Sequence, residues 1–234
     1  MTQPKIDVVN STTARETEAM LKRVDGPVLQ IGSRAQIVDR QENRWRNLVQ
    51  GKRFVGMDLE AGENVDVVGD VCAGFDQLDR TLGGERFGFI LCSHVLEHTK
   101  KPWVAAENIT RLLRPGGHCF IAVPWVQAYH GFPHDYWRIS FHGLAELFPD
   151  VEILDAYYSA SGTGFDVAYK VLVDGRIDVA RTPWEVEAQL FQVLLERDRN
   201  QAFLAEQAKA GQRKLLLARG YMPVTLVNIF ARKP

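Results

Sequence analysis

Apolar and polar positions form blocks along the first two thirds of the chain. Short apolar runs predict buried strands, and these runs cover residues 28–31, 54–57, 66–68, 87–92 and 119–123. Apolar residues at helical spacing predict a helix over 37–49 and another that begins near Pro102. Strands without polar alternation, separated by helices, are typical of a parallel sheet covered on both faces. The pattern therefore predicts an α/β protein.

The second predicted helix has a clear stop signal. It carries Ile109, Leu112 and Leu113 on one face, and the sequence "RPGG" follows at 114–117. Proline and paired glycines cannot extend a helix, so the helix is predicted to end there.

The last third of the chain differs from the rest. Residues 151–158 predict a sixth strand, and "SASGTGFD" after it predicts a flexible loop. A capping box opens a long charged helical stretch over 182–219, which we expect to cap one end of the sheet or to form an oligomerisation surface. The apolar segment 223–233 predicts a final strand that joins the sheet antiparallel to its neighbours.

Composition limits the partners of the protein. The chain 1–234 has a net charge of −1, 46% hydrophobic and 24% charged residues, which is typical of a single globular domain. Without excess positive charge we expect no nucleic acid and no anionic membrane as partner, which favours a small molecule. No apolar run reaches the roughly 18 residues of a membrane span and the N-terminus has no signal core, so we expect a cytoplasmic protein.

Small and polar residues follow the predicted strands. In an open parallel sheet, ligands bind at the carboxyl ends of the strands. The residues at those positions are Gly32, Ser33, Asp58, Asp70, Ser93, His94, Pro124 and Trp125. A glycine lets the backbone approach a ligand, a carboxylate ending the second strand can accept both ribose hydroxyls, and the next one can accept an amino group of a base. Together they predict a nucleoside site, although each carboxylate alone could be a turn residue.

These motifs resemble those of the class I S-adenosylmethionine-dependent methyltransferases, in their type-11-like form. The resemblance covers roughly residues 27–158, through "VLQIGS", "FVGMDLE", "VVGDV", "FGFILCSHVLEH" and "ENITRLLRPGGHCFIAVP". It implies a Rossmann-like, seven-stranded, mostly parallel sheet with helices on both faces, an antiparallel last strand and a helical insertion before that strand. It also implies S-adenosyl-L-methionine as the cofactor.

The resemblance assigns the strand ends to parts of this cofactor. The implied residues are Gln30, Gly32 and Ser33 for the methionine part, Asp58 and Leu59 for the ribose, Asp70 and Val71 for adenine, and Ser93 and His94 near the sulfonium. Gln30 stands where the family has an acidic residue, and Arg34 and Gln36 stand where it has glycines. Because Gln30 offers no negative charge to the cofactor's ammonium group, binding is expected to be weakened rather than lost.

The segment after the fifth strand, "PWVQAYHGFPHDYWRISFHGL", is the predicted acceptor side. His134, Asp135 and His130 are the predicted catalytic residues: His134 would take a proton from the acceptor, and Asp135 would orient it. That His134 and Asp135 merely tie this loop to the sheet stays open. Gly131 and Pro133 interrupt the helix that would align His130 with His134, so no metal site is predicted.

Four further side chains have structural interpretations. Trp137 and Phe141 are predicted to lie in the core, because aromatic residues at helical spacing usually do. Glu97 and His98 could cap or orient the helix after the fourth strand. Whether this pair has such a structural role or a functional one stays open.

The predicted function is methyl transfer to a small molecule that carries a hydroxyl or an amine. Similar "HDYWR" blocks in family members of sugar and natural-product pathways imply this acceptor class. One alternative is a protein that kept the fold and lost the reaction, with the 182–219 helices as a partner or homodimer interface. An NAD(P)-dependent oxidoreductase is disfavoured because the first loop lacks the glycines that cradle a pyrophosphate.

Overall fold

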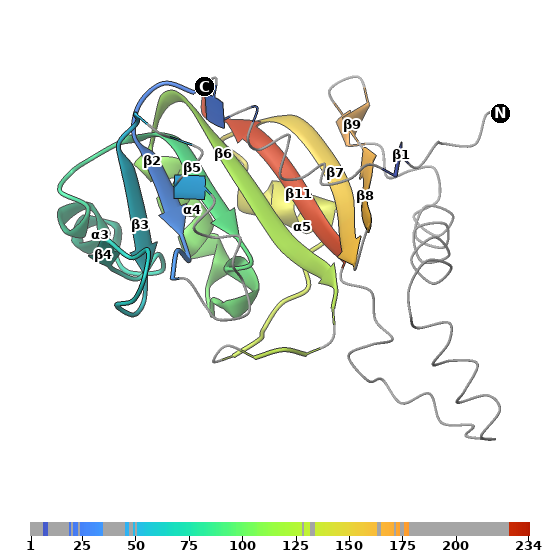
Figure 1. Cartoon of the computed structure of the whole chain (residues 1–234), viewed down its shortest axis with the longest axis horizontal. Coiled ribbons are helices and arrows are strands. Elements are labelled where there is room, and N and C mark those ends of the chain that lie inside the picture. Colours follow the sequence, from blue (N-terminus) through green and yellow to red (C-terminus); the bar gives the residue numbers. More distant parts are fainter. Residues whose placement is uncertain are drawn as a thin grey trace.

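The structure of the chain is a computed structural model (Figure 1). It describes residues 7–8, 19, 21–22, 24–34, 45–46, 49, 51–127, 129–131, 134–162, 165–170, 172–173, 176–177 and 225–234. The predicted helical insertion at 182–219 and most of the predicted helix at 37–49 lie outside these residues. None of the described helices has the length and apolar composition that a membrane crossing needs.

One nine-stranded sheet organises the fold, in the order β1-β8-β7-β11-β6-β5-β2-β3-β4 (Figure 1). Its strands are β1 (Asp7–Val8), β2 (Val28–Ile31), β3 (Phe54–Asp58), β4 (Val67–Val68), β5 (Phe87–Ser93), β6 (Leu113–Val126), β7 (Glu152–Gly162), β8 (Phe165–Lys170) and β11 (Thr225–Arg232). Within the described ranges, the helices with complete bounds are α3 (Phe75–Thr81), the 3₁₀ turn η1 (Leu96–His98), α4 (Pro102–Leu112) and α5 (Phe141–Leu147). A separate pair is formed by β9 (Leu172–Val173) and β10 (Arg176–Ile177).

The directions of the strands confirm the predicted fold class. From β4 through β3, β2 and β5 to β6, each neighbouring pair is parallel. The last strand, β11, lies between β6 and β7 and is antiparallel to both. The strands from β4 to β7 make up the expected seven-stranded sheet, and β8 and β1 extend it beyond β7.

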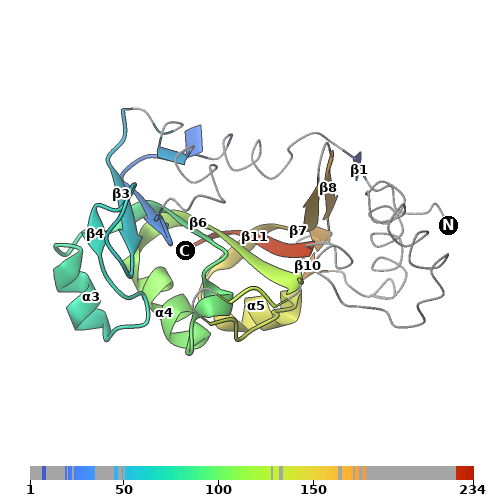
Figure 2. The ribbon, with the colours of Figure 1, turned by 60° about the horizontal axis from the view of Figure 1, so that its bottom comes forward.

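Both faces of the sheet are buried, which explains why its central strands lack polar alternation. Along β2, Leu29 and Ile31 pack into a large core cluster with residues of α3, α4 and α5, whereas Val28 packs into a second cluster on the opposite face. Figure 2 shows α3, α4 and α5 together on one side of the sheet. Leu21 and Val49 contribute to the cluster on the other side.

Three predicted boundaries are wrong. The strand predicted over 119–123 is only part of β6, which extends from Leu113 to Val126. The predicted flexible loop "SASGTGFD" is mostly strand, because β7 continues to Gly162 and β8 begins at Phe165. The buried Asn228 side chain of β11 donates a hydrogen bond of 2.8 Å to Ser159 Oγ, which ties this part of β7 to the sheet. Leu113, predicted on the face of the preceding helix, is instead the first residue of β6 and is extended, with φ −68° and ψ 135°.

Candidate functional site

Five of the predicted strand-end residues meet at one edge of the sheet. Pro124 and Trp125, which were predicted to follow the fifth strand, instead lie within β6. Ile31 of β2 pairs in register with Met57 of β3 on one side and with Cys92 of β5 on the other. Because these strands are parallel, the residues that follow them lie side by side at the same edge. These residues are Gly32 and Ser33 after β2, Asp58 at the end of β3, and Ser93 and His94 at the end of β5.

Gly32 is required by the local packing. Its φ is +73°, a left-handed conformation that favours glycine, and a Cβ there would clash with the Val95 side chain. The Gly32 amide donates to the Met57 carbonyl at 2.9 Å, and the Ser33 amide donates to the same carbonyl at 3.2 Å. One glycine is thus enough to turn the chain sharply after β2.

Two buried polar side chains beside this turn lack partners. Gln30 and Ser33 are both buried, and neither Gln30 Oε1 nor Ser33 Oγ has a hydrogen-bond partner within the described ranges. Buried polar atoms are nearly always hydrogen-bonded, so these two atoms mark a place where a polar ligand or water fits. Both residues belong to the predicted cofactor site, and their chemistry fits a polar ligand with donors.

Asp58 caps the turn after β3. Its carboxylate accepts a hydrogen bond from the Arg34 amide at 3.1 Å and another from the Glu60 amide at 3.4 Å. Arg34 stands where the family has a glycine. Its guanidinium pairs with the Glu60 carboxylate and not with Asp58. A carboxylate has about four acceptor positions, so Asp58 keeps capacity for further donors.

The adenine side of the predicted site is held by a residue that the sequence did not identify. Asn108 of α4 is buried and donates to the Val71 carbonyl at 2.7 Å and to the Ala73 carbonyl at 2.9 Å. Asp70 is exposed and accepts the Cys72 amide at 2.7 Å. In the sequence, Asn108 could have been identified as a polar residue on the otherwise apolar face of α4.

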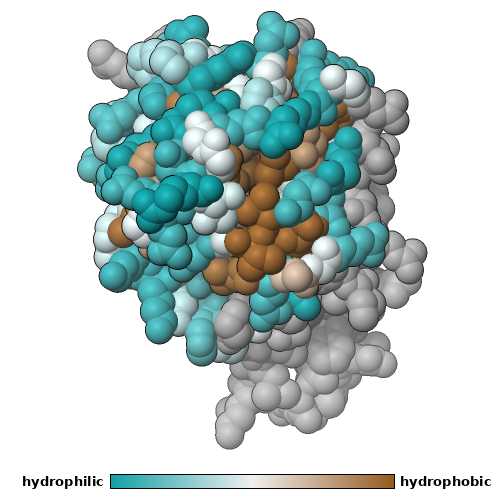
Figure 3. All heavy atoms as spheres, turned by 90° about the vertical axis from the view of Figure 1, so that its left-hand side faces the viewer, coloured by the Kyte–Doolittle hydropathy of each residue, from teal (hydrophilic) through white to brown (hydrophobic). Residues whose placement is uncertain are grey.

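Hydrophobic side chains are exposed near this part of the edge. Leu59, directly after Asp58, and Val68, at the end of β4, are among the exposed large hydrophobic residues. Viewed from the side that carries β4 and α3, hydrophobic residues gather in a patch framed by polar ones (Figure 3).

The turn after β5 is strained. His94 has a φ of +56°, which is uncommon for a residue other than glycine and is often found at functional sites. Its amide donates to the Ala122 carbonyl of β6 at 3.0 Å, and its Nδ1 atom lies 3.5 Å from Glu97 Oε1. Ser93, the preceding residue, is half-buried at the end of β5.

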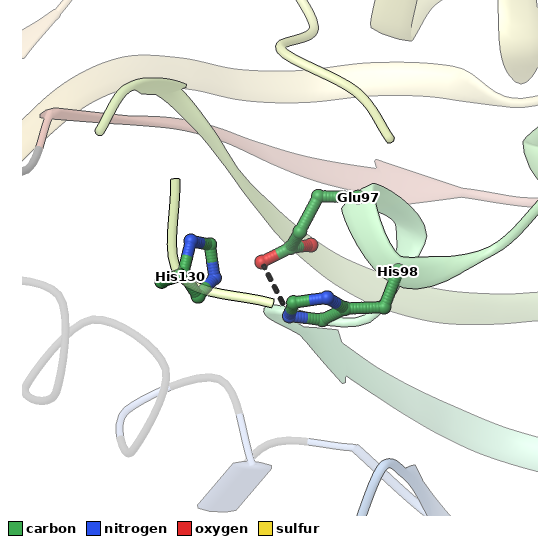
Figure 4. A group of neighbouring side chains, drawn as sticks. All are labelled: Glu97, His98 and His130. Atoms are coloured by element: carbon green, nitrogen blue, oxygen red, sulfur yellow. Dashed lines mark ion pairs between the residues drawn. The ribbon is translucent and has the colours of Figure 1, made fainter. Parts of the chain in front are cut away.

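Glu97 is the least solvated charged group of the site. Its side chain is 0% exposed, and neither carboxylate oxygen has a hydrogen-bond partner among the described residues. The Nε2 atom of His98 lies 3.8 Å from Glu97 Oε1. Figure 4 shows the carboxylate pointing toward the imidazoles of His98 and His130.

The segment after β6 folds back over η1. The amides of Tyr136 and Trp137 donate to the Glu97 carbonyl at 2.8 and 3.3 Å. The His98 Nδ1 atom hydrogen-bonds to the His134 carbonyl at 2.6 Å, and the Trp137 indole donates to the Thr99 carbonyl at 2.8 Å. Glu97 and His98 therefore dock the predicted acceptor segment.

His130 and Asp135, two of the three predicted catalytic residues, lie together. His130 Nδ1 is 3.2 Å from Asp135 Oδ2, and the His130 amide donates to the same oxygen at 3.0 Å. The Arg138 guanidinium donates hydrogen bonds to both Asp135 carboxylate oxygens, at 2.5 and 2.7 Å. The hydrogen bonds from Arg138 lower the pKa of the Asp135 carboxyl from 3.8 to about 2, and Asp135 in turn raises the pKa of Arg138.

The third predicted catalytic residue is placed differently. The His134 side chain is exposed, and its ring packs against Tyr136 at a centroid distance of 5.5 Å. We call Glu97, His98 and His130 the Glu97 cluster. His134 contacts this cluster through its carbonyl, which bonds to His98, and not through its imidazole. Pro133, expected to make this segment rigid, lies outside the described residues.

The two predicted core aromatic residues have different outcomes. Phe141 is buried in the main core, as predicted. Trp137 was predicted to lie in the core but is 37% exposed, because its indole nitrogen reaches a carbonyl at the surface.

Comparison with solved structures shows a similar fold at low sequence identity. A Bacillus halodurans protein with a provisional methyltransferase assignment is 14% identical, with a TM-score of 0.51 over 94% of this chain and 99% of that chain. The 1,6-didemethyltoxoflavin-N1-methyltransferase of Burkholderia thailandensis, solved with its acceptor and S-adenosylhomocysteine, is 16% identical, with a TM-score of 0.48 over 96% and 79% of the two chains. An S-adenosylmethionine-dependent methyltransferase of Archaeoglobus fulgidus is 15% identical, with a TM-score of 0.48 over 94% of each chain.

Among curated protein sequences, none matches the chain. The sequence model of a protein family described as "Methyltransferase domain" matches residues 13–161, which is more than half of the chain. The match confirms the predicted family and supports the predicted enzyme class. The chain belongs to the methyltransferase domain family.

Proposed function

We propose that this protein transfers a methyl group from S-adenosyl-L-methionine to an oxygen or nitrogen atom of a small-molecule acceptor. The carrying observation is the pair of buried, unpartnered polar atoms, Gln30 Oε1 and Ser33 Oγ, at the carboxyl edge of a methyltransferase-family sheet. Leaving such atoms unpaired costs about 1–3 kcal/mol each, so a bound ligand with polar groups is the natural partner. The cofactor supplies a methyl group on a sulfonium.

The cofactor-binding roles follow the order of the strands. Gln30 would accept a hydrogen bond from the ammonium group of the methionine part. Asp58 would bind the ribose hydroxyls with the lone pairs that the Arg34 and Glu60 amides leave over. Asp70 and Val71 would lie against adenine, in a loop that Asn108 holds in place.

The acceptor would lie over the turn after β5, between Ser93, His94 and the segment 129–138. Because the cofactor leaves as a neutral thioether, methyl transfer to the acceptor depends mainly on alignment and exclusion of water. A hydroxyl acceptor must also lose a proton, and the histidines around Glu97 are the candidates that face this region. His130 is the side chain best placed to contact the acceptor, while Asp135 positions its ring.

Cofactor binding is the test of the proposal. Isothermal titration with S-adenosylhomocysteine should show binding of one ligand per chain and a raised melting temperature, because a ligand that binds only the folded state stabilises it. NADH should give neither effect. Asp58→Ala should weaken binding by about 2–4 kcal/mol, since it removes charge-assisted hydrogen bonds to the ribose.

A matched control is Asp76→Asn, which changes an exposed carboxylate in the first turn of α3 and should bind like the wild type. Absence of binding by the wild-type chain at millimolar ligand would overturn the proposal in favour of a fold that lost its reaction. Unchanged affinity in Asp58→Ala would show that Asp58 serves only as a turn residue.

A further inference from the structure

The Glu97 cluster consists of one carboxylate and two imidazoles, which are side chains that commonly bind metal ions. Glu97, His98 and His130 each direct one ligand-type atom to a common place, and these atoms all lie within 4.8 Å of one another. Figure 4 shows that the carboxylate and one imidazole come from the same 3₁₀ turn, whereas the other imidazole comes from the segment after β6. We propose that these three residues bind one divalent transition-metal cation, such as Zn²⁺ or Mn²⁺.

The separations fit a shared ion. Metal–nitrogen and metal–oxygen bonds of such ions measure about 2.0–2.2 Å, so two ligands of one ion stand at most about 4.4 Å apart. The 3.8 Å between Glu97 Oε1 and His98 Nε2 lies within this limit. All three atoms lie within 4.8 Å of one another, so the wider separations must shorten by a few tenths of an ångström before one ion can bind all three. Two imidazoles with one carboxylate favour a transition metal over Mg²⁺ or Ca²⁺, which prefer oxygen ligands.

Both histidines are already oriented as metal ligands. A carbonyl oxygen can only accept, so the 2.6 Å contact from His98 Nδ1 to the His134 carbonyl requires the proton on Nδ1. The lone pair of His98 then lies on Nε2, the atom that faces Glu97. The Asp135 carboxylate, 3.2 Å from His130 Nδ1, orients the His130 ring beside Glu97 and His98. Carbonyl or carboxylate acceptors behind ligand histidines are the usual surroundings of metal sites.

The electrostatics of Glu97 are the independent observation. The carboxylate is 0% exposed and has no hydrogen-bond donor among the described residues; its nearest cation-forming groups there are the imidazoles of His94, at 3.5 Å, and His98, at 3.8 Å. Arg138, the cation whose pKa responds to Glu97, has its guanidinium engaged with both oxygens of Asp135. A bound divalent cation would give the buried carboxylate a direct partner of opposite charge.

The location links the cation to the acceptor. Val95 touches Gly32 and begins η1, so the cluster lies next to the strand ends of the proposed cofactor site. Three protein ligands leave coordination positions open, which an acceptor oxygen could occupy. A metal-bound hydroxyl loses its proton more readily, so the proton could pass to solvent water, and His130 would act as a ligand rather than as a base. This last step rests on the proposed function, whereas cation binding does not.

The test is a titration of the full chain with cobalt(II) chloride, after removal of metals with a chelator and without cofactor. We expect visible d–d absorption that saturates at one Co²⁺ per chain and that Zn²⁺ displaces. Glu97→Gln, which keeps the shape of the side chain, and His130→Ala should each weaken Co²⁺ binding by at least ~100-fold. Asp135→Asn should weaken it ~10–100-fold, the usual effect of losing a group that orients a ligand.

The control is His142→Ala, which removes an exposed histidine at the start of α5 and should bind Co²⁺ like the wild type. Thermal melting establishes that each variant is folded, and the wild-type titration decides alone whether a site exists. Failure of the wild-type chain to bind one Co²⁺ saturably would overturn the proposal. Wild-type affinity in folded Glu97→Gln and His130→Ala would do the same. Co²⁺ binding without S-adenosylhomocysteine binding would refute only the proposed function.

Discussion

Replacing Asp135 by asparagine should destabilise the folded protein by about 2 kcal/mol at pH 7. The Asp135 side chain is 1% exposed and forms two short contacts with Arg138, at 2.5 and 2.7 Å. These contacts lower the pKa of the carboxyl from 3.8 to about 2, a difference of about 1.8. Each pKa unit corresponds to about 1.4 kcal/mol, which gives about 2–3 kcal/mol from the ionised carboxylate; asparagine keeps one acceptor oxygen for Arg138, so about 2 kcal/mol should be lost.

The effect should depend on pH with a defined sign. Because the folded-state pKa lies below the unfolded-state value, the contribution of Asp135 is fully present above about pH 5. It is lost as the pH falls from about 4 to about 2, where the folded state must also take up the proton. Asparagine does not titrate, so the stability difference between wild type and Asp135→Asn should shrink over this window.

Urea unfolding followed by tryptophan fluorescence, at pH values from 7 down to 3, measures this difference. The matched control is Asp79→Asn, whose partner Arg86 also lies at 2.5 Å, with side chains 31% and 38% exposed. An exposed pair contributes at most about 1 kcal/mol, so this variant should cost clearly less. Equal losses in the two variants, or a loss in Asp135→Asn that stays constant down to pH 3, would refute the reasoning.

Two further variants test how the site is held. Gly32→Ala should cost about 1–3 kcal/mol in urea unfolding, because φ is +73° and the new methyl group meets Val95; a double variant with Val95→Ala should cost less than the sum of the single changes. If the costs simply add, the contact is not the cause. Asn108→Ala should cost about 1–3 kcal/mol and weaken S-adenosylhomocysteine binding, since it leaves two loop carbonyls without their donor. Glu107→Ala, an exposed neighbour on α4, should do neither, and a silent Asn108→Ala would remove its assigned role.

The strands could be predicted because burial on two faces leaves a direct mark on the sequence. β2 covers residues 28–31, as its apolar run predicts, since its three apolar side chains lie in one core or the other and Gln30 is also buried. The short helices α3 and α5 left no comparable mark. α3 buries only Leu78, and Phe75 is the other hydrophobic residue that packs against the core, so its seven residues are too few to show a helical period. The order of strands became predictable only through the family resemblance, because periodicity does not say which strands are neighbours.

The site was predictable as far as strand ends determine it. Gly32, Asp58 and Ser93 come together because parallel strands end at one edge, a property of the fold class. The pairing of His130 with Asp135 agrees with their closeness in the sequence. Which of the neighbouring imidazoles would face inward could not be predicted. Without regular structure in that loop, no period assigns His130 and His134 to opposite sides.

The role of Glu97 could not be predicted from residue spacing alone, because it depends on tertiary contacts. A charged residue between two histidines in "SHVLEH" is noticeable, but its surroundings come from residues more than 30 positions later. The segment that buries Glu97 is attached through the Glu97 carbonyl and the His98 ring, and it is stiffened by the Asp135–Arg138 pair. Glu97, whose buried carboxylate is costly in folding free energy, therefore also holds this segment through its carbonyl oxygen. A buried carboxylate without a hydrogen-bond donor is costly in folding free energy, and among the described residues the imidazoles of His94 and His98 are the cation-forming groups nearest to Glu97, so a bound cation would stabilise the arrangement. Asp135 stabilises the segment and orients His130 toward the same place. The stability of this loop and the affinity of the cluster for a cation should therefore depend on the same residue.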